Sequence, residues 1–270
     1  MKLRIPKLLV SVLVYAFDET RDFLGKRIGK EPEGRAVVLY YHAVRDRDRH
    51  RFARQMEVLA RRASPFPVES PPRMEKGGLY AAVTFDDGFV CVARNAVPEL
   101  GSRKIPGMIF APAATLGAPP SWISGTRHPD SSEVVMSDEE LRDLAVLPGV
   151  SIGSHCMTHR NLMNLDDEEA RREIRESKIR LEAILGKEVP SISFPHGAYD
   201  DRHTEMAYEA GYKHLFSISP TLYRYADPIK GRVRVEPTDW PLEFHLKLAG
   251  AYRWFHSVSS MKRKILGDLP

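Results

Sequence analysis

The chain has 270 residues, enough for one large domain or two small ones, and its 43% apolar and 28% charged residues are typical of a globular protein with ample material for a core. The net charge of +4 arises at the ends: residues 1–34 carry seven Lys and Arg against five Asp and Glu, and residues 245–270 carry five against one. The remaining 28 basic and 30 acidic residues exclude the basic working face of a nucleic-acid-binding protein.

Residues 1–34 form the first predicted segment, a helix or leader followed by a linker. Basic residues precede a short apolar run, as they do in a signal peptide. Leu8, Val12 and Phe23 also follow helical spacing, and the polar residues 18–22 fit the opposite face of a helix. We therefore favour a retained amphipathic helix. Its apolar run is too short to span a bilayer by itself.

The two basic ends allow two interpretations. They could contact an anionic membrane surface peripherally, or they could serve only solubility. Residues 262–264 give the second end a basic tip. We expect the protein to be cytoplasmic or membrane-associated rather than exported.

Seven stretches rich in apolar and β-branched residues are predicted as strands: 36–41, 81–85, 107–110, 150–153, 191–194, 214–218 and 232–235. Helical spacing and helix-boundary residues predict helices between most of them, at residues 51–62, 90–100, 166–185, 202–210 and 242–255. Ser137 and Glu140 form a capping box that opens a further helix. Residues 111–136 show no period and form a long irregular loop.

Strands that alternate with helices form a parallel sheet covered by helices, either as an open doubly wound sheet or as a closed barrel. The chain has no glycine-rich phosphate-binding fingerprint, which weakens the case for a nucleotide-binding open sheet. Its polar residues instead follow the strands, as His42, Asp86 with Asp87, His155 with His159, and His196 do. A barrel of this type gathers its site at the carboxyl ends of its strands.

Asp86 and Asp87 follow an apolar strand and precede a glycine, a pattern typical of either a turn or a site. His155 and His159 are four residues apart, and a helical turn would place both rings on one face. Such a pair is often only a surface or hydrogen-bonding pair. With an aspartate it becomes a set that binds a divalent ion and leaves positions open for water and substrate. A second aspartate can take a proton from water.

Three motifs carry a family resemblance. Residues 84–88 (Thr-Phe-Asp-Asp-Gly), 155–159 (His-Cys-Met-Thr-His) and 194–200 (Phe-Pro-His-Gly-Ala-Tyr-Asp) resemble, in order and spacing, the motifs of the polysaccharide deacetylase family, carbohydrate esterase family 4. Residues 40–44 (Tyr-Tyr-His-Ala-Val) are similar to a segment of its exopolysaccharide-processing branch. The resemblance covers residues 35–250.

The resemblance implies an α/β fold, a distorted (β/α) barrel of about seven parallel strands. This single domain would occupy residues 35–250, between the helix or leader of residues 1–34 and a basic tail at residues 251–270. The implied activity is a metal-dependent hydrolysis of N-acetyl groups on the amino sugars of a glycan. The expected partner is therefore an N-acetylated glycan, with no nucleic acid.

The resemblance also assigns roles to single residues. Asp87, His155 and His159 would bind one divalent metal ion, and Asp86 would be the general base. Zn²⁺ is the first choice, although two histidines and one aspartate suit other first-row ions as well. Cys156 lies between the two histidines, and we expect no ligand role for it.

Two positions depart from the family pattern. An arginine often orients the base aspartate from the third motif, but residues 191–194 contain none. Arg232 or Arg234 in the last predicted strand could supply the cation, and we take Arg234 as the catalytic candidate. The late histidine that acts as general acid has no clean match. His245 is the candidate, although its surroundings are also those of an ordinary helix.

Several residues are candidates for substrate binding. Trp122 could stack on a sugar ring or pin its loop, and His42 could touch the sugar or hold the barrel floor. His196 stands where the family often has a tyrosine, and it either lines the acetyl pocket or is structural. The full set is His42, Trp122, Pro195, His196, Gly197, Tyr199 and Trp240, the last of which follows Asp239 in a pair that resembles a late family motif.

Two other functions stay open at this point. The missing arginine and the unclear general acid allow a carbohydrate-binding protein on the same barrel with weak or no turnover. A related metal amidase could act on an amide that is not part of a sugar.

Overall fold

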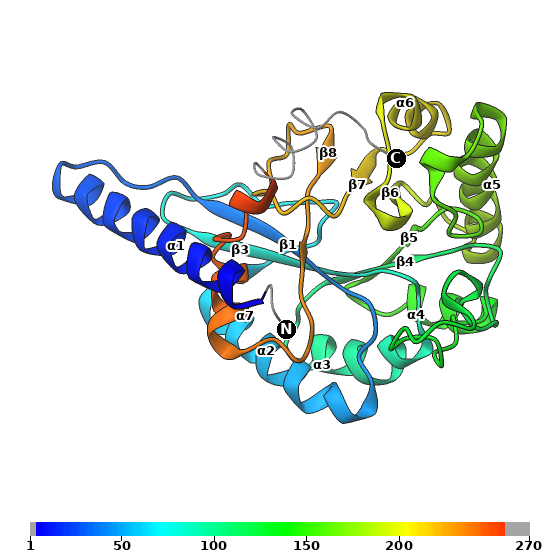
Figure 1. Ribbon diagram of the computed structural model, residues 1–270, viewed down its shortest axis with the longest axis horizontal. Coiled ribbons are helices and arrows are strands. Elements are labelled where there is room, and N and C mark those ends of the chain that lie inside the picture. Colours follow the sequence, from blue (N-terminus) through cyan, green and yellow to red (C-terminus); the bar gives the residue numbers. More distant parts are fainter. Residues whose placement is uncertain (1–3, 257–270) are drawn as a thin grey trace.

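The computed structural model describes residues 4–256 and shows one curved sheet with helices packed around it (Figure 1). The strand order is β8-β7-β6-β5-β4-β3-β1-β9, and β2 pairs with β3. All of these pairs are parallel. The sheet curls into an incomplete barrel, so the predicted α/β barrel class is confirmed.

The seven predicted strands are present, and two strands of two residues each, β2 and β8, add to them. The bounds are β1 Arg35–Tyr41, β2 Ser64–Pro65, β3 Leu79–Phe85, β4 Gly107–Ala111, β5 Val150–Ser154, β6 Ser191–Ser193, β7 His214–Phe216, β8 Ile229–Lys230 and β9 Val233–Arg234.

The α-helices are α1 Arg4–Arg27, α2 Arg49–Arg62, α3 Val97–Ser102, α4 Asp138–Ala145, α5 Asp167–Leu185, α6 Asp201–Glu209 and α7 Pro241–Leu248. The capping box of Ser137 and Glu140 is present at the start of α4. The helix predicted at residues 90–100 is divided into a π-helical turn, Val92–Ala96, and α3. The last helix ends at Leu248 instead of residue 255. Gly250 breaks it with a φ of 74°, in the left-handed region that glycine adopts readily.

Alternate residues of β1 serve two separate cores, as the two-residue period of a strand requires. Val37, Leu39 and Tyr41 join the larger core between the sheet and the outer helices. Ala36 and Val38 face the barrel interior, where they belong to a smaller cluster with Tyr80 and Ala82 of β3, Phe110 of β4 and Phe216 of β7. The barrel is therefore filled by side chains at its lower levels, and its polar residues gather at the carboxyl ends of the strands.

Candidate functional site

The Asp-Asp-Gly segment after β3 is both a turn and the centre of the site. Asp87 and Gly88 have φ values of 68° and 62°, so the chain reverses in the left-handed region. A Cβ on Gly88 would lie 3.1 Å from the Cβ of Ala111, which leaves little room for a larger residue. The Asp86 N–H donates to the Tyr41 carbonyl across 2.9 Å, which fixes the first aspartate at the end of the sheet. The two interpretations of this motif are therefore compatible.

Asp87, His155 and His159 are all buried, and each offers a ligand atom within 4.8 Å of the others. Asp87 Oδ1 lies 3.1 Å from His159 Nε2 and 3.7 Å from His155 Nε2. That oxygen makes no well-directed hydrogen bond to any residue in the described part of the chain. A buried carboxylate oxygen that faces two imidazole nitrogens fits a divalent ion, because buried polar atoms otherwise find partners.

The charge state of these residues also suits a metal. His155 Nδ1 lies 2.7 Å from the Ser193 carbonyl, which can only accept, so this nitrogen carries the proton and Nε2 is free to bind. Burial lowers the pKa of His155 to about 4, so the ring is neutral at pH 7. Burial raises the pKa of Asp87, but its contact with His159 and the charges of His42, His159 and His155 outweigh burial and hold the pKa well below its ordinary value.

The two histidines do not lie on a helical turn, so that prediction is wrong. They lie in an irregular loop after β5, in which Cys156 and His159 have φ values of 61° each. The buried Glu173 of α5 braces this loop by accepting from the N–H groups of Met157 at 3.0 Å and Thr158 at 2.8 Å. Backbone strain of this kind persists only where surrounding contacts over-determine it.

Glu173 is a site residue that the sequence analysis missed. Charged residues in a helix such as that predicted at 166–185 usually form its solvated face. Glu173 nevertheless directly precedes Ile174 and is three residues after Ala170, both of which are on the buried stripe of α5. Its position could have been found from the sequence, because Glu173 is a carboxylate next to the apolar stripe of a helix that follows a polar loop.

Asp86 is paired with Arg232 inside the barrel. Arg232 Nη1 and Nη2 donate to Asp86 Oδ1 and Oδ2 at 2.7 and 2.9 Å, a two-pronged contact. Arg232 is itself fully buried, and its guanidinium lies 4.8 Å from the ring centre of Tyr40 and 5.1 Å from that of Phe110. Burial raises the pKa of Asp86, but the charge of Arg232, then that of His155, more than compensates, so the pKa lies below its ordinary value.

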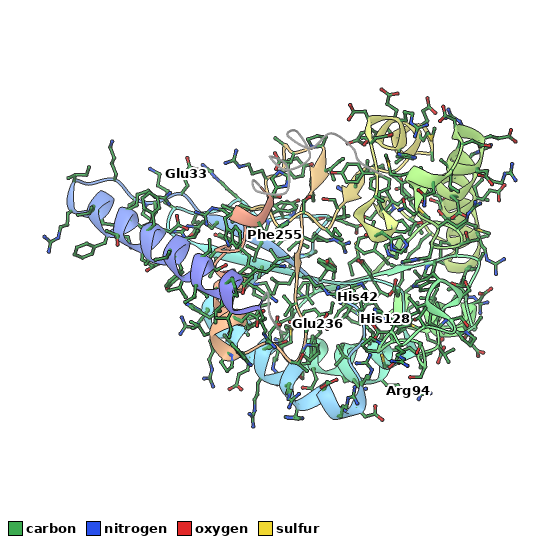
Figure 2. All side chains as sticks on the ribbon, in the orientation of Figure 1. Glu33, His42, Arg94, His128, Glu236 and Phe255 are labelled. Carbon is green, nitrogen blue, oxygen red and sulfur yellow. The ribbon has the colours of Figure 1, made fainter. Side chains whose placement is uncertain are left out.

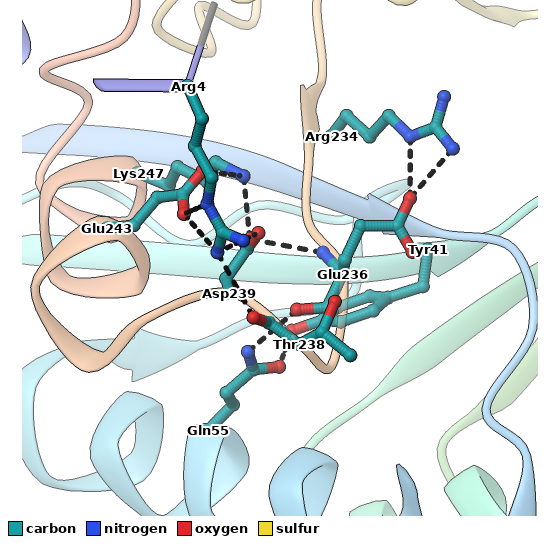
Figure 3. A network of polar contacts seen from close by, with 9 residues as sticks. All are labelled: Arg4, Tyr41, Gln55, Arg234, Glu236, Thr238, Asp239, Glu243 and Lys247. Carbon is teal, nitrogen blue, oxygen red and sulfur yellow. Dashed lines mark hydrogen bonds and ion pairs between the residues drawn. The ribbon is translucent and has the colours of Figure 1, made fainter. Parts of the chain in front are cut away.

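The selection of Arg234 as the cation beside Asp86 is wrong, and Arg232 takes that place. The two arginines are two residues apart in an extended segment, so their side chains leave the backbone on the same side of the sheet. Arg234 begins two residues, or roughly 7 Å, nearer the carboxyl end of the strand. It is 55% exposed and pairs with Glu236, as Figure 3 shows.

Trp122 and His196 lie beside the metal set. Trp122 stacks on the His159 ring with 4.2 Å between ring centres, and His196 meets the same ring edge-on at 4.7 Å. With Thr158, His159 and Asn161 they line an open cavity of about 690 Å³. Burial and the charge of His159 lower the pKa of the half-buried His196. The predicted position of both side chains near a sugar is compatible with this cavity.

The other residues of the third motif shape the loop rather than line this cavity. His196 and Gly197 have φ values of 59° and 63°, and a Cβ on Gly197 would lie 2.3 Å from Ile218 Cγ1. Tyr199 stacks on Phe194 with ring centres 5.0 Å apart, and Pro195 is buried. They hold His196 in place, and their predicted contact with substrate is not tested.

Trp240 and His245 lie elsewhere, which does not fit the roles predicted for them. Both belong to the α7 region, and this helix packs against α1, α2 and β1 on the outside of the barrel. Trp240 is capped by the Arg4 guanidinium at 4.5 Å, and His245 meets the Tyr15 ring of α1 at 5.1 Å. The amphipathic pattern of residues 242–255 correctly predicts a helix but does not say which side of the sheet it covers.

His42 directly follows β1 and lies near the middle of the molecule (Figure 2). Its Nδ1 is buried and has no hydrogen-bond partner among residues 4–256. Tyr41 of β1 pairs in parallel register with Phe85 of β3, so His42 and Asp86 follow their strands side by side at the same edge of the sheet. His42 is therefore a part of the site that was predicted only as a sugar contact or floor residue.

Comparison with known proteins agrees with this geometry. The sequence model of the family described as polysaccharide deacetylase matches residues 74–215, just over half of the chain. YxkH of Bacillus subtilis (strain 168), which carries the same family name, is 25% identical over 131 residues, 48% of this chain and 42% of the relative. The chain thus matches less than half the length of that relative.

Solved structures share the fold. IcaB from Ammonifex degensii has a TM-score of 0.65 at 23% identity, over 81% of this chain and 97% of that one. The deacetylase PplD of Streptococcus pyogenes, in complex with acetate, has a TM-score of 0.65 at 16% identity, over 81% and 99%. BC0361, a polysaccharide deacetylase from Bacillus cereus, has a TM-score of 0.65 at 23% identity, over 80% and 69%.

The family match includes both aspartates, both loop histidines and His196, while His42 and Arg232 lie outside it and join the site through the fold. The chain belongs to the polysaccharide deacetylase family, hydrolases that act on amide bonds.

Proposed function

We propose that the protein removes N-acetyl groups from the amino sugars of a glycan with the help of one divalent metal ion held by Asp87, His155 and His159. The observation that carries this proposal is the buried three-residue donor set, which lies directly beside the paired Asp86 and Arg232. Zn²⁺ suits two imidazoles and one carboxylate, and other first-row ions suit them too.

A divalent ion in this set supplies Lewis acidity, which makes water a stronger nucleophile and polarises an acetyl carbonyl. Asp86 accepts the proton of the attacking water, because Arg232 keeps its carboxylate ionised and oriented. The buried pair also limits the movement of the base, so the proton is taken at a defined place. Adjacent aspartates thus divide two tasks, one holding the metal and the other handling the proton.

His42 is our candidate for the proton donor to the leaving amine. Its Nδ1 has no hydrogen-bond partner in the described part of the chain, and it follows β1 next to the point where Asp86 follows β3. His245, the earlier candidate, packs on α1 instead. An imidazole is the usual side chain for this task, because it can lose and regain a proton near neutral pH.

The cavity beside His159 is our candidate for the sugar site. Trp122 provides an aromatic wall and His196 a polar one, and both contact the ring of His159 in the metal set. Rings of this kind pack against the apolar faces of a sugar, and few polar groups then set its orientation. The lack of an arginine in residues 191–194 had allowed a protein without turnover. Arg232 supplies that cation from a later part of the chain instead.

The purified protein is expected to release acetate from N-acetylated oligosaccharides, to lose this activity with a chelator and to regain it with Zn²⁺. His155→Ala removes one of three protein ligands, so metal content measured by elemental analysis should fall from about one ion per chain toward zero. A parallel screen of small amides separates a sugar deacetylase from a general amidase. Binding of the glycan without acetate release, on metal-loaded protein, would contradict the proposed function.

His42→Gln is expected to lower kcat by about 10²-fold, because glutamine keeps polarity but cannot donate a proton to the leaving amine. KM and metal content should change little. A fall in kcat without a change in KM, metal content or melting temperature would not follow from a purely structural role. His50→Gln on the exposed side of α2 is the matched control. Wild-type turnover in His42→Gln would exclude this residue as the acid.

A further inference from the structure

Helix α1 packs on the body through a mixed face, on which Leu8, Val12 and Tyr15 contact the main core beside buried polar residues. Ser11 and Asp18 are buried, although they are polar residues of a surface helix. Trp254 Nε1 donates to Ser11 Oγ at 2.9 Å, and Arg253 pairs with Asp18 at 2.8 Å. Arg35 also contacts Asp18, at 3.6 Å. A buried aspartate with two arginine partners fixes how the helix is rotated about its axis.

The start of α1 is anchored in the same way. Arg4 Nε donates to Glu243 Oε2 of α7 at 2.7 Å, and its guanidinium lies 3.7 Å from Asp239. Figure 3 shows this network, in which Lys247 joins the two carboxylates from the other side. Because both halves of α1 are held by ion pairs, its outer face is set by the fold.

That outer face is apolar. The α1 apolar stripe consists of Ile5, Leu9, Leu13, Phe17, Leu24 and Ile28, which are 54%, 60%, 69%, 67%, 56% and 72% exposed. Ile5, Leu9, Leu13 and Phe17 are four residues apart and Leu24 is seven beyond Phe17, so these five share one face of α1, and Ile28 follows directly after the helix. Figure 1 shows α1 along one edge of the molecule, with its outer side away from the sheet. A large exposed apolar patch marks an interaction site.

The charges beside the stripe are basic. Lys26 and Arg27 are exposed at the end of α1, and Arg21 is 56% exposed although it pairs with Asp22 at 3.0 Å and with Asp18 at 3.5 Å. Of the three acidic residues of α1, Asp18 is buried and Asp22 is bound by Arg35, so only Glu19 faces solvent freely. The exposed face therefore combines apolar side chains with a positive margin, as helices that lie in the interface of an anionic membrane do.

We propose that α1 lies in the plane of an anionic lipid bilayer, with the α1 apolar stripe among the upper acyl chains and Arg21, Lys26 and Arg27 at the lipid phosphates. No helix among the described residues is long and apolar enough to cross a membrane. The contact differs from one made by basic chain ends alone, because its main contribution comes from apolar side chains. It is also independent of the deacetylase chemistry.

A second copy of the chain fits this face less well than lipid does. In an antiparallel pair of α1 helices, Lys26 and Arg27 of one copy would approach the first turn of the other, which contains no acidic residue to pair with them. In a parallel pair, Arg27 would face Arg27. Like charges in such positions oppose association, and Glu19 offers only one exposed acidic partner. Lipid phosphates remove this conflict, since every basic residue then has a partner.

The full-length protein is expected to float with vesicles of equal phosphatidylglycerol and phosphatidylcholine, and to bind pure phosphatidylcholine more weakly. Leu13→Glu with Phe17→Glu should lower the bound fraction about tenfold, since binding scales with buried apolar area. Lys26→Glu with Arg27→Glu should weaken binding only to the anionic vesicles, and high salt should do the same. Ile179→Glu, a similar change at an exposed position of α5, is the matched control.

All variants should keep their circular dichroism and their acetate release from a small N-acetylated oligosaccharide, because none touches the site. Wild-type protein that stays unbound with either vesicle overturns the proposal. The same holds if Leu13→Glu with Phe17→Glu floats as the wild type does. A concentration-dependent dimer that the stripe variant abolishes, without vesicle binding, would assign the α1 apolar stripe to a second copy instead.

Discussion

Asp86→Asn is expected to lower the rate of acetate release by about 10²- to 10⁴-fold, because the amide keeps the shape of the side chain but cannot accept the proton. Asp87, His155 and His159 are unchanged, so metal content should stay at the wild-type level. Loss of the carboxylate also leaves the buried Arg232 without its ion pair, so the melting temperature should fall. Acetate assays, elemental analysis and thermal unfolding check the three parts separately.

Asp18→Asn is the matched control for this variant. Asp18 is also a buried aspartate with arginine partners, but it belongs to α1 and lies outside the site. The control should therefore lose stability while keeping turnover on a small substrate. If Asp86→Asn retained full activity, the assignment of Asp86 as the base would be wrong. If both variants lost activity equally, the effect would come from destabilisation.

Arg232→Met is expected to lower the free energy of unfolding by about 3–5 kcal/mol, because it leaves a buried carboxylate without its cation. Arg234→Met should change this free energy by less than about 0.5 kcal/mol, since Arg234 is exposed and pairs only with Glu236. The double variant Asp86→Asn, Arg232→Met should recover part of the lost stability but none of the activity. Denaturant unfolding of the four proteins measures these differences.

The pH dependence of stability gives this prediction a second readout. Arg232 holds the pKa of Asp86 below its ordinary value, so the ion pair contributes stability above the pKa of the unfolded chain and loses it as the pH falls through the folded pKa. In Arg232→Met, burial raises the pKa of Asp86. The free energy of unfolding of the variant should therefore rise relative to that of the wild type as the pH falls. If the difference in the free energy of unfolding between wild type and variant did not shrink at acid pH, the pairing of Arg232 with Asp86 would be contradicted.

Much of the fold could be predicted because its signals are local. The β-branched runs at residues 36–41 and 81–85, the capping box at Ser137 and the glycine that ends α5 each act within a few residues. The metal set was also within reach, because parallel strands bring their carboxyl ends to one edge whatever loops join them. The loop of His155 and His159 differs from the expected helical turn, because Glu173 stabilises its backbone from another element.

Which side chains lie next to the two aspartates depends on distances in the folded structure, and a local sequence pattern does not contain those distances. Arg232 and Arg234 have the same residue type and the same parity in one strand, and only their depth in the barrel separates them. His245 and Trp240 lie on a helix that covers the outside of the sheet, whereas His42 lies at its carboxyl edge. The sequence alone therefore did not show which of these side chains lies near Asp86.

The sequence by itself determined the alternation of strands and helices and the motifs that contain Asp86, Asp87, His155 and His159, because hydrophobic period and motif spacing are properties of short segments. The resemblance carried by those motifs then implied the barrel. The tertiary structure alone decided that Arg232 pairs with Asp86, that Glu173 braces the histidine loop and that α1 presents its apolar side outward. These last features require contacts between residues more than a dozen positions apart, and burial and ion pairing select among side chains that are equivalent in the sequence.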